Sequence, residues 1–509
     1  MAKREKVLRS TLMVTLVIIL SKAAGFARDI VTTAKFGLSF ENDAYVSAYS
    51  LFYLPVLLLN SCISATLIPL YVEEREQNSL AHSNRFASNS INLFAAASLL
   101  ITVVMYALAG PIIRLVYSGF EPAKLDCTVQ LFRTMVLGLV FNVSSISVAS
   151  LLNAQEKYIA AQLTGFPLSV CVILASVAFA DTFGIQAVAW GVFAANTLQL
   201  LILIPFLRGW FHYSPLIDFR DKRFHRLMAL AVPAMLSMGI SELNHMIDHA
   251  LASGLPEGTL ASMTSAYRLV TFLQGILIVP LTTIMFSKMS RRVAEHDERG
   301  ALKMLTESLL QLAVVVLPVV TIGIVMSRDV IQFAYMRGRF GMQDVIRTAS
   351  VLAFYVIGIP AFGMRDFLSR MFHALKDTRT PFRVSCVVVA TNVVLNIILR
   401  RYMGANGLAL ATSIAGYVGT ALLIALLKRR FGKIGLRSTV REAAKTIAAT
   451  AVCAAICIVM NRVVPPAVGM LQIFVRLAIC SAASLTGFLL ACAAFRVKSL
   501  RQLARGLKR

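Results

Sequence analysis

Nine basic residues fall within or at the ends of long apolar stretches, where an ionised side chain needs a partner or a cavity. They are Lys22, Arg28, Lys35, Arg133, Arg268, Arg347, Arg365, Arg370 and Arg476. A charge at the centre of a bilayer costs roughly 2.5–3.5 kcal/mol on insertion scales, so such residues usually have a function. Arg268 has no acidic neighbour in the chain, and a guanidinium matches phosphate oxygens with its planar fork. We expect Lys22, Arg28 and Arg268 to bind an anion.

The first apolar stretch combines both signs of charge with a hydroxyl group. On a helix, Ser21 and Arg28 share one face, and Lys22 and Asp29 share another, because the members of each pair are seven residues apart. Gly25 lies between the two cations, and a bend there would direct both toward one cavity. Structural ion pairs are the alternative: Lys22 with Asp29, Arg28 with Asp43, and Arg268 with Asp248 or Glu242.

A polar strip interrupts the apolar stretch near residue 245. Glu242, His245 and His249 recur at i, i+3 and i+7, and Asn244 and Asp248 at i and i+4. Proton or Na⁺ coordination by Asp248 with Asn244 and Glu242 is one interpretation, and structural pairing of helices is the other. The histidines have the spacing of an HExxH zinc motif but lack its glutamate, so we expect no metal site.

A second charged group ends the stretch near residue 370. Arg365 and Arg370 precede a short polar turn that contains Asp377. This group would serve as an inner gate, or else it anchors a helix end, with Pro381 opening the next helix. Phosphate-binding glycine loops and catalytic triads are absent from the sequence, so we expect neither an enzyme nor a cofactor.

The elements that position these residues are membrane-spanning helices. Hydrophobic residues make up 58% of the 509 residues and charged residues 15%, with a mean hydropathy of +0.74. Soluble proteins average about 25% charged residues, so several soluble domains are excluded. The eight cysteines form no CxxC pair and predict no disulfide framework. The first stretch is expected to be a helix rather than a cleaved signal. We predict an all-α polytopic protein with about fourteen spans: 8–35, 44–72, 86–109, 128–152, 158–180, 184–207, 224–252, 258–287, 302–326, 345–374, 381–400, 404–427, 443–462 and 470–495.

The remaining positive charge follows the predicted topology. The formal net charge is +25, from 50 basic and 25 acidic residues. With a cytoplasmic N-terminus, 33 of the basic residues lie in inner segments and 8 in outer loops. This asymmetry satisfies the positive-inside rule with both termini in the cytoplasm. Anionic membrane lipid is therefore the expected partner of these charges, and nucleic acid is not needed.

Short sequence echoes predict two parallel repeats. Residues 47–51 recur at 265–269, residues 152–157 at 372–377 and residues 184–189 at 404–409, with offsets of 218 to 220. Six helices separate equivalent positions, so both halves have the same orientation and the substrate site is expected between them. We predict an N-terminal lobe at 1–210, a C-terminal lobe at 211–430, and a final helix pair with a basic tail at 431–509.

Several stretches resemble the lipid II flippase family (MurJ/MviN) of the multidrug/oligosaccharidyl-lipid/polysaccharide exporter superfamily. The resemblance covers most of the first twelve predicted helices, and the segments in the first helix and around residues 370–381 are the most specific. The matching segments are 21–29 with 42–45, 242–253, 266–269, 337–340 and 370–381.

The resemblance implies fourteen helices, two six-helix lobes and a terminal pair that forms a groove for a lipid tail. It implies a flippase of the bacterial cytoplasmic membrane that moves a polyprenyl-diphosphate-linked peptidoglycan precursor to the outer leaflet. Lys22, Arg28 and Arg268 would then engage the diphosphate, while Asp29 and Asp43 would organise the outer end. Transport would be driven by the membrane potential, Na⁺ or H⁺. Cell-wall synthesis proteins are candidate partners that the resemblance leaves undecided.

One residue and one short stretch depart from the family pattern. Lys22 stands where arginine is common, which keeps the charge but loses the bidentate fork. The stretch Val56–Ser61 carries no charge, where the family often has an arginine pair and a glutamate. The uncharged stretch favours two alternatives, a flippase for another polyprenyl-linked polysaccharide and a cation-coupled drug exporter of the same superfamily. A membrane scaffold of the cell-wall machinery is an alternative of a different class.

Overall fold

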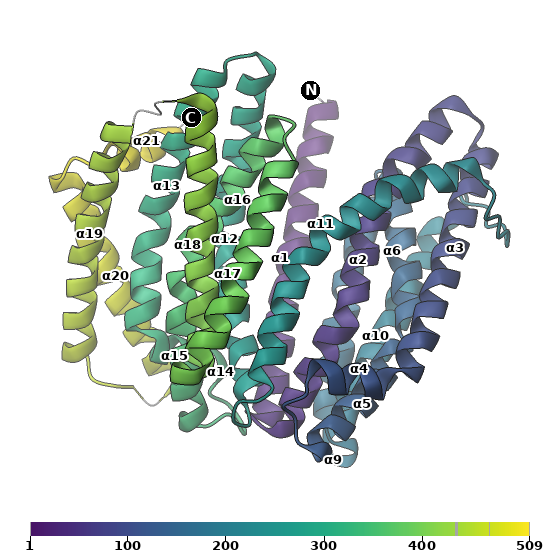
Figure 1. Cartoon of the computed structure of the whole chain (residues 1–509), viewed down its shortest axis with the longest axis horizontal. Helices are drawn as coiled ribbons and strands as arrows, with labels where there is room; N and C mark the ends of the chain where they lie inside the picture. Colours follow the sequence, from purple (N-terminus) through teal and green to yellow (C-terminus); the bar gives the residue numbers. More distant parts are fainter. Residues whose placement is uncertain (1, 433–435, 468, 508–509) are drawn as a thin grey trace. The chain divides into compact units, whose positions relative to one another are not determined.

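The computed structural model describes residues 2–432, 436–467 and 469–507, and these residues form helices without any β-strand (Figure 1). Residues 508–509 of the predicted basic tail lie outside the described residues. Contacts divide the chain into an N-terminal unit, residues 1–261 with 337–340, and a C-terminal unit, residues 262–336 with 341–509. This boundary differs from the predicted lobe boundary at 210/211, which stays a prediction. Ion pairs from Arg223 to Glu74 and from Arg226 to Glu73 tie the segment after residue 211 to the N-terminal unit.

The N-terminal unit contains eleven α-helices, the start of a twelfth, and three short 3-10 or π elements among its described residues. They are α1 (Ala2–Phe36), α2 (Phe40–Gln77), α3 (Leu80–Ala107), α4 (Ala109–Val116), α5 (Pro122–Val136), α6 (Leu139–Ala154), α7 (Tyr158–Gln162), η1 (Leu163–Gly165), α8 (Pro167–Leu174), η2 (Ala175–Phe179), α9 (Ala180–Phe183), α10 (Gln186–Leu203), η3 (Ile204–Leu207), α11 (Lys222–Ala252) and the first turn of α12 (Thr259–Ala294).

The C-terminal unit holds the rest of α12 and nine further helices. They are α13 (Glu298–Val325), α14 (Ser327–Tyr335), α15 (Met342–Ile357), α16 (Ile359–Ala374), α17 (Arg379–Met403), α18 (Ala405–Phe431), α19 (Leu436–Val463), α20 (Met470–Ala494) and α21 (Lys498–Leu507). The last long helices, α19 and α20, pack on each other, and α19 also packs on α13.

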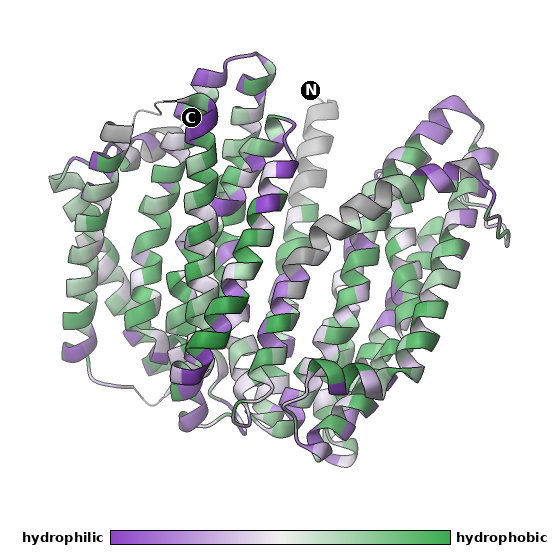
Figure 2. Cartoon of the chain, in the orientation of Figure 1, coloured by the Kyte–Doolittle hydropathy of each residue, from purple (hydrophilic) through white to green (hydrophobic). Residues whose placement is uncertain are grey.

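Eleven helices of the described chain are long and apolar enough to cross a membrane, and the bent pair α5–α6, which turns by 41°, makes up to twelve. Figure 2 shows hydrophobic residues along the middle of helices such as α18 and α19, with hydrophilic residues at their ends. Helices α1 and α11 have 35 and 31 residues and carry the charged segments predicted above. The chain is therefore a multi-pass membrane protein, and fourteen spans stays a prediction.

Capping and proline placement explain where the helices begin and why they continue. The Ser39 hydroxyl accepts a hydrogen bond from the Asn42 amide at the start of α2, and Asp297 does the same for Gly300 at the start of α13. Pro55 and Pro69 lie inside α2 without ending it. Membrane helices tolerate such prolines because neighbouring helices and hydroxyl side chains satisfy the freed carbonyl groups.

Candidate functional site

Arg28 on α1 is buried, with an exposed fraction of 8%. Its Nε and Nη2 atoms both donate to Oδ1 of Asp29, at 3.2 and 3.1 Å. The third guanidinium nitrogen, Nη1, donates to none of the described residues. Tyr45 and Tyr49 of α2 are the next electrostatic neighbours of the guanidinium. The alternative pairing of Arg28 with Asp43 is therefore wrong, because Arg28 pairs with Asp29 and Asp43 pairs with Lys124.

The other predicted residues of α1 lie in different surroundings. Lys22 is exposed and forms no ion pair with the residues that the structure describes, so the alternative pairing with Asp29 is also wrong. Ser21 packs against the backbone of Gly165, which has no side chain at the contact. The helix continues through Gly25 without a break, so the α-helix itself sets the separation of Lys22 and Arg28.

Asp43 on α2 is fully buried and lies at the centre of a polar cluster in the N-terminal unit. Oδ2 accepts from Lys124 Nζ at 2.6 Å and from the Gly258 amide at 2.8 Å, and Oδ1 accepts from the Ala261 amide at 2.8 Å. The first amides of a helix lack partners within the helix. Asp43 therefore caps the start of α12 from another helix, and its role at the outer end of a transport cavity stays a prediction.

Lys124 belongs to this cluster, although its position in the sequence suggested an outer loop. It lies in the first turn of α5, has an exposed fraction of 9%, and also stacks on Phe120, with Nζ 4.3 Å from the ring centroid. Pro122 was a signal that a helix begins there, since proline is favoured in the first helical turn. No signal in the sequence paired Lys124 with a residue 81 positions away.

The polar strip of α11 is formed as predicted along one helix. Asp248 is buried, while Glu242, Asn244, His245 and His249 are half-buried. Nδ1 of His249 is buried and has no hydrogen-bond partner among the described residues. Across the described chain, no group of three or more His, Cys, Asp or Glu side chains is placed to hold a metal ion.

Arg268 lies on α12 in the C-terminal unit and is half-buried. The neighbouring Tyr267 ring packs edge-on against Tyr355, with ring centroids 5.5 Å apart. Tyr267 is also an electrostatic neighbour of Arg365 on α16, whose Cδ packs over Gly419 of α18. Tyr267 and Arg365 thus lie near each other within this unit, and Arg268 follows Tyr267 on the same helix.

The remaining gate residues lie at the end of α16 and in the turn that follows. Arg370 pairs with Asp366 at 3.0 Å, one helical turn away. Asp377 accepts from the amide and hydroxyl of Thr380 at 3.0 and 2.7 Å, and lies 3.6 Å from Arg430. These contacts hold the pKa of the Asp377 carboxyl below its usual value, mainly through the Thr380 amide. Asp377 therefore organises the α16–α17 turn.

One further buried ion pair was not predicted. Arg476 of α20 pairs with Asp329 of α14, and its Nη2 donates to the Asn461 carbonyl at 3.0 Å. Both charged residues are buried, with exposed fractions of 9% and 6%. Arg476 was recognised as a cation within a span, but Asp329 stands 147 positions away in a loop-like segment. This pair attaches the terminal helices to the C-terminal unit.

Comparison with known proteins gives a consistent picture. A family model described as lipid II flippase MurJ matches residues 32–478. Probable lipid II flippases MurJ from Rhizobium tropici and Rhizobium meliloti (strain 1021) are 27% and 29% identical to the chain. The alignments cover 88% and 80% of this chain and 86% and 78% of theirs.

Solved structures support the fold. A structure titled as lipid II flippase MurJ in an inward closed conformation matches with a TM-score of 0.80 at 22% identity, covering 98% of this chain and all of that one. An inward-facing multidrug resistance transporter of the MATE family, from the MOP superfamily, matches with a TM-score of 0.70 at 14% identity, covering 84% of this chain and 99% of that one.

Proposed function

Since this chain belongs to the lipid II flippase MurJ family, we propose that it moves lipid II, the polyprenyl-diphosphate-linked peptidoglycan precursor, across the bacterial cytoplasmic membrane. Members of such a family are transporters rather than enzymes. The observation that carries the proposal is the match to the family model over residues 32–478. The match begins near the end of α1, after Arg28, and includes all later elements through α19. Both termini would lie in the cytoplasm, as the distribution of basic residues favours.

Repeated contacts in the two units support an architecture of two parallel repeats. The Tyr117 hydroxyl donates to the Ser47 carbonyl at 3.1 Å, and the Tyr335 hydroxyl donates to the Ser265 carbonyl at 3.3 Å. The two tyrosines are 218 positions apart in the sequence, and so are the two serines. Helices α6 and α16 begin and end 220 positions apart. Parallel repeats of this kind bind substrate between the halves.

The diphosphate would be engaged by Lys22, Arg28 and Arg268. Nη1 of Arg28 is directed to none of the described residues, so a phosphate oxygen can take this donor without breaking the bond to Asp29. Such charge-assisted hydrogen bonds are the strong ones for phosphate. Asp29 would fix the guanidinium, and Asp43 would fix the start of α12.

Alternating access would carry the headgroup while the tail stays in lipid. Arg365, Arg370 and Asp377 would lie at the inner gate, where the Arg370–Asp366 and Asp377–Arg430 pairs stabilise the end of α16. The membrane potential supplies about 2.3 kcal/mol per charge per 100 mV. Glu242, Asn244 and Asp248 on α11 would bind a coupling cation, Na⁺ or H⁺.

Replacing the cations with glutamine tests the proposal in cells depleted of their own lipid II flippase. We expect Arg28→Gln and Arg268→Gln to abolish growth while the proteins still accumulate in the membrane. Arg133→Gln and Arg347→Gln are the matched controls, because both arginines lie in spans but are exposed. Full complementation by Arg28→Gln and Arg268→Gln would contradict the assignment of these residues to the diphosphate.

A drug exporter is the second candidate, favoured by the structural match to a MATE transporter and by the uncharged stretch Val56–Ser61 of α2. Transport of labelled lipid II into the lumen-facing leaflet of proteoliposomes separates the two functions. A flippase would move lipid II and show no competition from organic cations. An exporter would move the cations and leave lipid II in place.

A further inference from the structure

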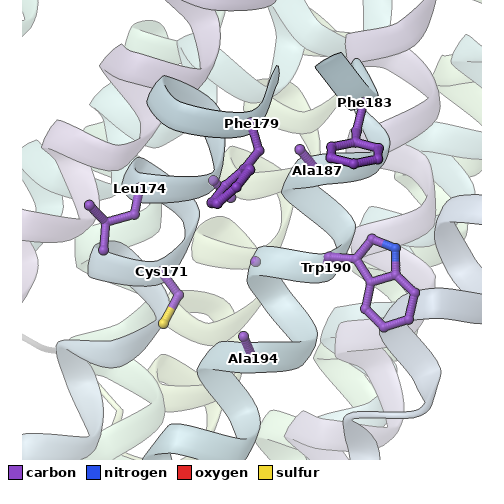
Figure 3. Close-up of a pocket in the computed structure, with 9 residues that line it drawn as sticks. Cys171, Leu174, Phe179, Phe183, Ala187, Trp190 and Ala194 are labelled. Atoms are coloured by element: carbon purple, nitrogen blue, oxygen red, sulfur yellow. The ribbon is translucent and has the colours of Figure 1, made fainter. Parts of the chain in front are cut away.

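An apolar pocket of about 440 Å³ lies on the N-terminal unit between α8, η2 and α10 (Figure 3). Its volume is within the range of about 300–1,000 Å³ that is usual for ligand sites. Small residues form its floor: Ala175, Ala187 and Gly191 are buried, and a Cβ atom at Gly191 would lie 2.8 Å from that of Ala175. The helices therefore approach closely at the floor, where there is no side chain to fill the space above.

Large aromatic residues form the walls. Phe179, Phe183 and Trp190 are 55%, 62% and 52% exposed. The Trp190 ring packs edge-on against Phe193 at 5.7 Å, which holds it at the side of the pocket. Phe179 ends the π-helical segment η2, a local widening that is frequent at functional sites. The walls thus project from spans whose outer surface faces lipid.

The depth of the pocket matches one leaflet. Both walls run away from the turn at Gly184, and the lining residues farthest from it along the chain, Cys171 and Ala194, are 13 and 10 positions away. At about 1.5 Å per residue these positions lie roughly 20 and 15 Å from the turn. Half of a hydrocarbon core is about 15 Å thick. A chain that enters at the turn would therefore reach the middle of the bilayer.

Charge at the Gly184 turn is suited to a phosphate. Lys35 Nζ lies 2.7 Å from Oδ1 of Asp181, which stands between the two wall phenylalanines. Arg339 is a further electrostatic neighbour of Asp181, and its amide donates to the Ala34 carbonyl at 2.8 Å. Two cations against one carboxylate leave this end of the pocket with a net positive charge, and phosphate groups lie at that level of a bilayer.

We propose that this pocket binds one acyl chain of a membrane glycerophospholipid, whose phosphate lies beside Lys35 and Arg339. The lining offers only the Trp190 indole N–H and the Cys171 thiol as polar side-chain groups, so most hydroxyl and amide groups of a sugar, a peptide or a drug would stay unpaired there. The hydrocarbon available to a pocket on the outer surface of membrane spans is the acyl chain of the surrounding lipid. The lining residues do not include Lys22, Arg28 or Arg268, so the proposal does not depend on the proposed transport function.

Photocrosslinking tests the proposal on the full chain in vesicles of phosphatidylethanolamine and phosphatidylglycerol. The probe is a phosphatidylglycerol with a diazirine in one acyl chain, and peptide mass spectrometry maps the labelled residues. We expect labelling of residues 171–194 to exceed that of the exposed α17 surface, which includes Val387 and Val394, by several-fold. Ala194→Phe, at an exposed lining position, should fill the pocket and bring this labelling down to the level of α17.

Leu201→Phe is the matched control, because Leu201 is exposed on the same helix but does not line the pocket. This variant should keep the full labelling, and Lys35→Gln should reduce it. Equal labelling of α10 and α17, or unchanged labelling in Ala194→Phe, would overturn the proposal. Labelling by a diazirine-bearing polyprenyl diphosphate but not by the phospholipid would also overturn it, since the occupant would then be the substrate tail. Thermal unfolding of each variant shows that the fold is retained.

Discussion

The ammonium group of Lys124 lies 2.6 Å from Oδ2 of Asp43, and both side chains are buried. The same carboxylate accepts the Gly258 and Ala261 amides at the start of α12. A single aspartate thus joins the beginnings of α2, α5 and α12. Because a buried charge without a partner is strongly unfavourable, the two side chains should depend on each other energetically.

Lys124→Met should lower the free energy of unfolding by about 3–5 kcal/mol, the usual effect of removing one member of a buried ion pair. Asp43→Asn should be similarly harmful, because an amide oxygen replaces only part of the lost acceptors. The double variant should lose less than the sum of the single losses. Thermal unfolding in detergent measures these differences, with Lys35→Met as the control, because the Lys35–Asp181 pair is largely exposed. Strict additivity would show that the two side chains do not interact.

Gly338→Ala should destabilise the N-terminal unit. Gly338 has a φ of +57°, and a Cβ atom there would collide with the Ala34 carbonyl at the end of α1. Replacing glycine in such a conformation costs more than the roughly 0.4–1 kcal/mol that alanine gains elsewhere. Gly341→Ala is the control, since its Cβ atom would meet open space and its φ is negative. Equal unfolding temperatures of the two variants would refute the steric explanation.

The sequence was sufficient to predict the all-helical fold class. It was not sufficient to predict which charged residues form ion pairs between helices. Apolar stretches located the long helices because a membrane helix needs about 20 such residues regardless of its neighbours. The ion pairs of Lys124 and Asp329 could not be predicted from the sequence, because their partners are 81 and 147 positions away. Motif spacing describes one helix at a time, and an ion pair between helices depends on packing that no local pattern records.

The segment before α11 is held to α3 by asparagine side chains. Asn89 donates to the Asp218 carbonyl at 3.0 Å and accepts from its amide at 2.7 Å, and Asn92 donates to the carbonyls of Ser214 and Leu216 at 3.1 and 2.8 Å. The asparagine side chains thus pair with backbone amide and carbonyl groups of a segment that forms no helix. The segment is therefore fixed although it has no regular structure.

Asn89→Ala should release this segment, because the variant loses both bonds to Asp218. We expect faster amide hydrogen exchange at Ser214 and Asp218, and a loss of about 1–3 kcal/mol from unsatisfied backbone groups. Asn60→Ala should leave exchange unchanged, since Asn60 is exposed and, among the residues that the structure describes, its side chain only accepts from the Ser64 hydroxyl one turn away. Exchange that is slow in both variants would mean that other contacts hold the segment.

Acidification should weaken the α16–α17 turn through Asp377. The Thr380 amide and hydroxyl hold the pKa of this carboxyl below its ordinary value of 3.8. Because the folded-state pKa is depressed, the carboxylate stabilises the fold at pH values above 3.8, and this stabilisation is lost as the pH falls through the folded value. The unfolding temperature of the native chain should therefore exceed that of Asp377→Asn near neutral pH, and the difference should shrink below about pH 4. Thr380→Val removes the hydroxyl donor but keeps the amide, so it should give an intermediate profile. A difference that grows on acidification would have the wrong sign and would exclude Asp377 as a stabilising carboxylate.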